Sequence, residues 1–158
     1  MHPHKALINE FYTAFAKRDS QAMAACYHGD ATFKDPVFSD LTGAEIGAMW
    51  AMLCHQAKTL EITVSDVQAD TQFGQAKWTA RYEYGKPPRP VYNIIKAQFE
   101  FRDGKIIRHV DRFSLWKWSR MALGPLGFLL GWNSQVQDRI RQQARSNLKK
   151  FITNINNS

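Results

Sequence analysis

Asp35 is the first side chain in the sequence with a defined setting for acid–base chemistry. It follows a short strand predicted for residues 31–33 and directly precedes Pro36. Proline lacks a backbone N–H and restricts the preceding residue to extended conformations, so we expect this carboxylate at a strand end and not in a flexible loop. A carboxylate held in this way could act as a general base. An aspartate before proline also commonly serves only to form a turn, and both interpretations stay open here.

His109 and Asp111 are the second candidate group, on a strand predicted for residues 105–118. Residues two apart on a strand share one face and lie about 6.5–7 Å from each other, so this pair and Phe113 are predicted to face inward. Burial raises the pKa of a carboxylic acid and a nearby charge shifts it further, as acid–base catalysis requires. The alternative is structural: Asp111 pairs with a neighbouring arginine or a backbone donor, and His109 is a hydrogen-bonded core residue.

Helical periodicity predicts the elements of the first third of the chain. An amphipathic helix is expected over residues 7–17, followed by a helical turn over residues 19–27. A third helix is expected to begin at Thr42, which has capping-box spacing to Glu45. This helix should present Trp50 to the interior.

From Leu60 onward the hydrophobic period changes from helical to two. It predicts strands near residues 60–64, 78–84, 91–101 and 105–118, the last two joined by a hairpin at Asp103-Gly104. Three helices followed by an antiparallel meander indicate an α+β fold. A curved, mainly antiparallel sheet around the first helix would enclose a pocket.

This order of elements resembles the nuclear-transport-factor-2-like superfamily over residues 5–118, most closely its SnoaL-like and ketosteroid isomerase-like branches. The strings Asp35-Pro36-Val37 and Asp103-Gly104-Lys105 carry the resemblance. It implies a cone-shaped half-barrel with Asp35 as general base, and acid–base residues at His109 and Asp111. It also implies a homodimer that pairs through the sheet. We therefore divide the chain into a cone domain, residues 1–118, and a C-terminal extension, residues 119–158.

The predicted ligand is an apolar small molecule, because the side chains expected around the pocket are mostly aromatic. The expected ligand-binding residues are Phe11, Phe15, Tyr27, Trp50, Trp78, Tyr82, Asn93 and Phe113. Ketosteroid isomerisation itself is not expected. That reaction needs two hydrogen-bond donors for the enolate oxygen, and the resemblance places Phe11 and Ala97 at their positions. Aromatic residues also fill ordinary cores, so a non-catalytic binding module is the alternative to an enzyme.

The C-terminal extension contains an apolar, glycine-broken stretch at residues 121–132 and a helix predicted for residues 134–152. That helix has a basic surface and one apolar stripe, formed by Val136, Ile140, Ala144, Leu148 and Phe151. We interpret it as a strap that packs on the domain or on a dimer partner. A membrane surface is the alternative partner, since tryptophans and a basic amphipathic helix have interfacial composition. Nucleic acid is not expected, because no base-reading or stacking platform is evident.

Composition sets the remaining limits. The chain has 158 residues, 44% of them hydrophobic, which suits one globular core. Its net charge of +7 is uneven, because residues 102–158 hold 11 basic against 3 acidic residues. Two cysteines are too few for a disulfide framework, and neither a signal peptide nor a membrane span is evident, so a cytoplasmic location is predicted. No cofactor motif is present, and Asp35, His109 and Asp111 lack metal-ligand spacing, so neither a cofactor nor a metal is predicted.

Overall fold

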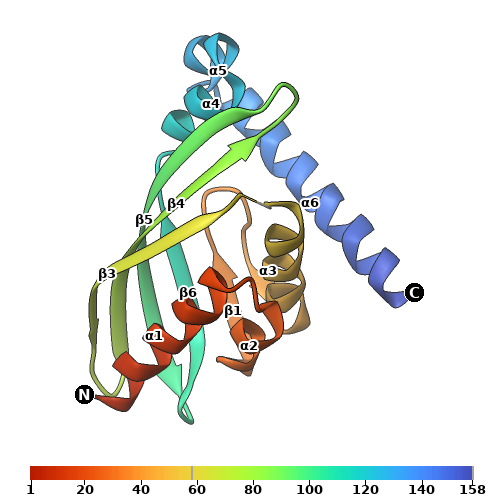
Figure 1. The fold of residues 1–158 in the computed structure, drawn as a ribbon. Coiled ribbons are helices and arrows are strands. Elements are labelled where there is room, and N and C mark those ends of the chain that lie inside the picture. Colours follow the sequence, from red (N-terminus) through yellow and green to blue (C-terminus); the bar gives the residue numbers. More distant parts are fainter. Residues whose placement is uncertain (58, 158) are drawn as a thin grey trace.

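A curved β-sheet forms the frame of the protein and wraps around its first helix (Figure 1). The computed structural model describes residues 1–57 and 59–157, and within these residues the sheet has six strands in the order β2-β1-β6-β5-β4-β3. The elements along the chain are α1 (Pro3–Ala16), α2 (Ser20–Ala25), β1 (Tyr27–Lys34), β2 (Leu41–Thr42), α3 (Ala44–Gln56), β3 (Glu61–Ala69), β4 (Phe73–Tyr84), β5 (Arg89–Arg102), β6 (Lys105–Arg112), α4 (Leu115–Leu123), α5 (Pro125–Leu130) and α6 (Ser134–Asn156). This α+β arrangement, with a helix appended at its C-terminal end, confirms the predicted fold class.

The sheet combines a meander with one parallel pair. Strands β3 to β6 pair antiparallel in chain order, as predicted. Strand β1 instead pairs parallel with β6, with Phe33 opposite His109 and Lys34 opposite Val110. One step further along this register, Asp35 follows β1 beside Asp111. The parallel pair therefore brings the two predicted carboxylates to the same end of the sheet.

The first two helices differ slightly from the predicted bounds. Helix α1 begins at Pro3, four residues before the predicted start, because proline suits the first helical position and the His2 side chain accepts a 3.1 Å hydrogen bond from the His4 N–H. Helix α2 is capped by Asp19, whose side chain accepts from the Ala22 N–H. It ends at Ala25, because Tyr27 already belongs to β1.

The predicted capping box of the third helix forms only in part. The N-cap of α3 is Gly43, which makes no side-chain cap. Glu45 still reaches back to Thr42 and accepts from its backbone N–H at 3.1 Å and from its hydroxyl at 3.3 Å. The spacing between Thr42 and Glu45 thus indicated the start of the helix correctly, but the N-cap is Gly43, one residue after the predicted Thr42.

The predicted strand over residues 105–118 is wrong beyond Arg112. Strand β6 ends there and helix α4 begins at Leu115, because the Ser114 side chain accepts a 3.2 Å hydrogen bond from the Lys117 N–H and caps the new helix. Helices α4 and α5 were not predicted as helices. Since α4 continues through residue 118, the chosen boundary between cone domain and extension falls inside a helix, and that division stays a prediction.

Helix α6 lies alongside α3 and next to the loop that follows β1 (Figure 1). Its Leu148 is buried in the main core cluster. Arg141 donates to the Pro36 carbonyl and Arg145 to the Ser39 carbonyl, each at 2.8 Å. The apolar stripe of α6 therefore packs against the body of the protein, and two of its arginines hold the loop that carries Asp35.

Removing the Leu148 side chain tests this docking. Leu148→Ala is expected to lower the free energy of unfolding by about 2–4 kcal/mol, because it deletes a fully packed side chain and leaves a cavity. Urea unfolding at pH 7 measures the change. Leu129→Ala is the matched control, since Leu129 is 63% exposed and its removal should change stability by less than about 0.5 kcal/mol. Equal losses in both variants would contradict the docked position of α6.

Candidate active site

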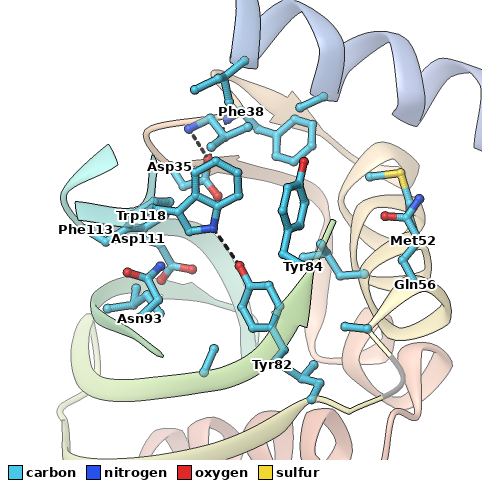
Figure 2. A pocket seen from close by; sticks show the side chains of 18 of the residues that line it. Asp35, Phe38, Met52, Gln56, Tyr82, Tyr84, Asn93, Asp111, Phe113 and Trp118 are labelled. Carbon is cyan, nitrogen blue, oxygen red and sulfur yellow. Dashed lines mark hydrogen bonds between the residues drawn. The ribbon is translucent and has the colours of Figure 1, made fainter. Parts of the chain in front are cut away.

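A cavity of about 510 Å³ lies between the concave face of the sheet, helix α3 and the C-terminal helices. Figure 2 shows Asp35, Asp111 and Asn93 along one side, with Met52 and Gln56 of α3 on the opposite side. Most of the wall is apolar, so the few polar side chains stand out. Polar side chains from the sheet and the loop after β1 include Asp35, Tyr82, Glu83, Tyr84, Asn93 and Asp111, and helix α4 adds Trp118.

Asp35 is fixed by a tight turn at the end of β1. Its Oδ1 accepts hydrogen bonds from the backbone N–H groups of Val37 at 2.8 Å and Phe38 at 2.6 Å, and its own N–H donates to the Phe38 carbonyl at 2.8 Å. The turn interpretation of Asp35 is therefore correct, and the same turn aims the carboxylate into the cavity.

The pKa of Asp35 is shifted into the neutral range. Burial among the cavity walls and, to a smaller extent, the nearby charge of Asp111 raise it to about 7, although the two backbone hydrogen bonds act in the opposite direction. Asp35 is only partly shielded from solvent because it borders the cavity, yet protein surrounds it on its other sides. A carboxyl group with such a pKa can both take up and release a proton near pH 7.

Asp111 is the second carboxylate of the cavity and is held from behind. Its Oδ1 accepts from Nε2 of His109 at 2.8 Å and from the indole N–H of Trp78 at 3.4 Å. Asp111 is only 3% exposed, but its side chain still borders the cavity. The structural alternative paired Asp111 with a neighbouring arginine or a backbone donor, whereas its side-chain partners are the histidine two residues earlier on the same strand face and Trp78.

His109 belongs to a buried hydrogen-bonded chain and does not line the cavity. Its Nδ1 lies 2.7 Å from the Tyr27 hydroxyl, which accepts a 3.0 Å hydrogen bond from the Trp50 indole. One arrangement satisfies every group: Trp50 donates to Tyr27, Tyr27 donates to Nδ1, and Nε2–H donates to Asp111. His109 then orients Asp111, so it is a core residue that acts on the site through its neighbour.

The other predicted site residues separate into two groups. Six of the eight predicted ligand-binding residues border the cavity: Phe15, Trp50, Trp78, Tyr82, Asn93 and Phe113. The remaining two, Phe11 and Tyr27, do not. Phe11 packs edge-on against Trp50 and His109, with ring centroids 5.6 and 5.8 Å apart, so it supports the wall from behind. The alternation of residues along the strands identified the face of the sheet that points inward. It gave no information on which inward side chains reach the cavity and which lie behind its wall.

Trp118 is the main site residue that the sequence analysis missed. It comes from α4, and its indole N–H donates to the Tyr82 hydroxyl at 2.7 Å across the cavity (Figure 2). The Tyr82 proton is then available to a ligand. Helix α6 adds Arg139 and Gln143 to the wall. The signal for α4 was present in Ser114, a good N-cap residue directly before an apolar helical pattern.

Tyr12 is an unexpected neighbour of this site. Its hydroxyl is buried and makes no hydrogen bond within the described residues. Its ring lies 5.9 Å from that of Trp78, and burial, followed by the charge of Asp111, raises its pKa well above the ordinary value. Tyr12 is therefore a neutral phenol behind the cavity wall and not part of its surface.

In the part of the chain that the structure describes, residues 1–57 and 59–157, the His, Cys, Asp and Glu side chains form no group of three or more that could hold a metal ion. Within the same residues, no helix combines the length and apolarity needed to cross a bilayer.

Comparison with known proteins identifies the family of this chain. The family model of the SnoaL-like domain matches residues 8–109, which is well over half of the chain. The protein therefore belongs to the SnoaL-like domain family, within the nuclear-transport-factor-2-like superfamily. No curated protein matches the sequence.

Solved structures show the same fold at low sequence identity. A hypothetical protein from Catenulispora acidiphila with a ketosteroid isomerase-like fold, in complex with trimethylamine, is 16% identical with a TM-score of 0.65, over 75% of this chain and 93% of that one. An LEH-like epoxide hydrolase from M. tuberculosis is 19% identical with a TM-score of 0.65, over 81% of this chain and 95% of that one. A putative polyketide cyclase from Xanthomonas campestris is 19% identical with a TM-score of 0.63, over 75% and 96%.

Proposed function

We propose that this protein binds an apolar small molecule in the cavity and transfers a proton on it, with Asp35 as the catalytic acid–base group. The observation that carries the proposal is a carboxyl group with a pKa of about 7, fixed at the wall of a largely apolar cavity. General bases work best when their pKa lies near the working pH. A small apolar cavity with a few convergent polar groups is also the usual form of a small-molecule site.

The other polar groups have separate roles in this proposal. The Tyr82 hydroxyl and the Asn93 amide border the cavity and can hydrogen-bond a polar substituent of the ligand. Asp111 is held by His109 and Trp78, so it provides a second, oriented carboxylate on the same side as Asp35. His109 is a positioning residue. Two carboxyl groups with different surroundings allow one to take a proton while the other binds or returns one.

The proposal does not extend to ketosteroid isomerisation. Phe11, at the position where the resemblance expects a donor, lies outside the cavity wall. Ala97, at the other position, is the direct cross-strand partner of Asp111. Related folds described as a putative polyketide cyclase and an LEH-like epoxide hydrolase support acid–base chemistry on small molecules as the class to test.

The base-catalysed elimination of 5-nitrobenzisoxazole tests for a positioned base without knowledge of the natural ligand. A carboxylate removes the ring C–H proton, the electron pair forms the nitrile as the N–O bond breaks, and the oxygen leaves as a phenolate. We expect the rate to rise with pH with a midpoint near 7, because Asp35 must be deprotonated. Asp35→Asn should lower the rate by about 10²-fold or more. Asp70→Asn, in a similar turn on the exposed surface, should leave it unchanged.

Binding is measured separately through the fluorescence of Nile red in the cavity. Asp35→Asn should still bind the dye, because it retains the apolar wall. A wild-type protein that binds Nile red but eliminates no faster than Asp35→Asn would be a binding module, and the enzyme proposal would fail. Absence of dye binding would contradict the ligand site itself.

A homodimer stays part of the proposal. Tyr92 and Ile94 lie on the convex face of β5 and are 45% and 48% exposed. Exposed apolar side chains in the middle of a sheet face are consistent with pairing between two copies.

A further inference from the structure

Six large apolar side chains are exposed within ten residues of the C-terminal extension. The group, which we call the α5 patch, consists of Leu123, Leu126, Phe128, Leu129, Leu130 and Trp132. Their exposed fractions run from 36% for Leu123 to 69% for Trp132. The patch lies at the end of the molecule where α4 and α5 meet, far from the N-terminus (Figure 1). Exposed apolar groups of this density usually mark an interaction site.

The glycines of α5 explain why its large side chains point outward. Gly127 is buried, and a methyl group added to it would overlap the Ser119 carbonyl of α4. A methyl group on Gly131 would meet the Gly127 carbonyl and the Ser119 side chain. Helix α5 therefore packs on α4 through its smallest residues. An ordinary surface helix buries its leucines, whereas this one buries glycine and presents leucine and phenylalanine to solvent.

The patch is held in this orientation by polar contacts at its base. The Trp116 indole donates to the Phe128 carbonyl at 3.3 Å, and the Arg89 side chain donates to the Met121 carbonyl at 3.1 Å. The Arg120 guanidinium lies over the Trp116 ring, 5.1 Å from its centroid. Lys117 is exposed on the same helix. A tryptophan-containing apolar surface with a cationic border is the composition of segments that bind at the surface of an anionic membrane.

We propose that the α5 patch docks onto an anionic lipid surface. Charge complementarity favours this occupant over a second copy of the chain. Residues 113–137, which contain α4, α5 and the start of α6, include Lys117 and Arg120 and no acidic residue, so a symmetric dimer through the patch would bring the cations of both copies together. Anionic headgroups would instead attract them, by about 1 kcal/mol for each lysine or arginine near the surface. Helix α5 has six residues and is about 9 Å long, so it would lie in the headgroup region without crossing the bilayer.

Helix α4 connects this patch to the cavity. Its Trp118 and Leu123 border the cavity, and Leu123 also belongs to the patch. Docking through α5 would bring this wall of the cavity close to the lipid surface. The docking proposal stands on the exposed patch and its charges alone, so it does not depend on the proposed proton transfer.

Vesicle flotation with the full chain tests the proposal. Vesicles of phosphatidylcholine with phosphatidylglycerol should bind the protein, while pure phosphatidylcholine vesicles should bind it more weakly, and added salt should reduce the difference. The double variant Leu126→Ser/Leu129→Ser should bind at least about tenfold more weakly, because it removes two of the inserting side chains. Phe73→Ser/Ile155→Ser removes the same number of exposed apolar side chains, 50% and 48% exposed, from outside the patch and should bind as wild type does. Circular dichroism confirms that both variants are folded.

Two further variants test the roles of charge and of insertion into the lipid. Lys117→Gln/Arg120→Gln should weaken binding to the anionic vesicles and flatten its salt dependence. Trp132→Phe should reduce the quenching of protein fluorescence by brominated acyl chains. The proposal is overturned if wild type does not bind the anionic vesicles, or if both apolar double variants bind equally. It is also overturned if light scattering without lipid shows that Leu126→Ser/Leu129→Ser dissolves a dimer, since the occupant is then a second copy.

Discussion

Asp35→Asn is expected to stabilise the protein at pH 8.5 and to lose this advantage at pH 4. The folded-state pKa of Asp35, about 7, lies above the ordinary aspartate value of 3.8. The protonated form is therefore favoured by folding, and its contribution is complete below about pH 4 and lost as the pH rises through 7. Allowing for water in the cavity, we expect a gain of about 2–4 kcal/mol in the free energy of unfolding at pH 8.5. Asparagine can still accept from the Val37 and Phe38 N–H groups, so the turn is retained.

Thermal unfolding across pH 4–9 measures this effect, as a rise in melting temperature of roughly 5–15 °C at the alkaline end. Asp70→Asn is the matched control. Asp70 makes the same turn, with Oδ1 accepting from the N–H groups of Gln72 and Phe73, but it is fully exposed. These hydrogen bonds lower its pKa, so its carboxylate stabilises the fold at neutral pH and the asparagine variant should be slightly less stable there. A parallel response of both variants to pH would contradict the assigned burial of Asp35.

His109→Ala should be the most destabilising single substitution in the site. It leaves Asp111 with the Trp78 indole as its remaining donor and removes the acceptor of the Tyr27 hydroxyl. His109 is fully buried, and its ring lies 4.4 Å from that of Phe99, so the variant also leaves a cavity. Breaking a buried pair of this kind typically costs about 3–5 kcal/mol. We therefore expect a fall in melting temperature of roughly 6–20 °C at pH 7.

A second histidine–aspartate pair supplies the control. His28 lies 3.3 Å from Asp103 on the surface, where solvent screens the interaction. His28→Ala should change stability by less than about 1 kcal/mol. Tyr27→Phe keeps the ring but removes the hydroxyl, so His109 and Trp50 each lose a hydrogen-bond partner. Its loss of unfolding free energy should lie between those of the two histidine variants, at about 1–3 kcal/mol. If His109→Ala and His28→Ala unfold at the same temperature, the buried chain does not exist in solution.

The concave face of the sheet was predictable because its signal is local. Alternation along β5 placed Asn93, Ile95, Ala97 and Phe99 on one face, and all four are buried. Proline after Asp35 fixed the direction of the chain at the end of β1 in the same way. The hydrophobic period of a strand and the residue preferences of a turn depend on only a few neighbouring residues. A single sequence is therefore sufficient to identify them.

The depth of each side chain was not predictable from these signals. His109 and Asp111 share a face, but only Asp111 borders the cavity, because Phe11 of α1 and Trp50 of α3 pack against the His109 ring. Trp118 was missed for a related reason. It reaches Tyr82 only because α4 turns back over the mouth of the cone. Contacts between segments far apart along the chain decide both outcomes.

The pairing of β1 with β6 has a consequence for the order of folding. Phe33 and His109 are register partners although more than seventy residues separate them in the chain. Contacts between distant segments form slowly, because the intervening chain must be closed into a loop first. During synthesis β1 emerges early and can pair only with the two-residue strand β2 until β6 has left the ribosome. The hairpins from β3 to β6 can form before β1 joins them, and only this last step brings Asp35 beside Asp111. The centre proposed for catalysis is thus assembled at the end of folding, by the contact with the largest separation along the sheet.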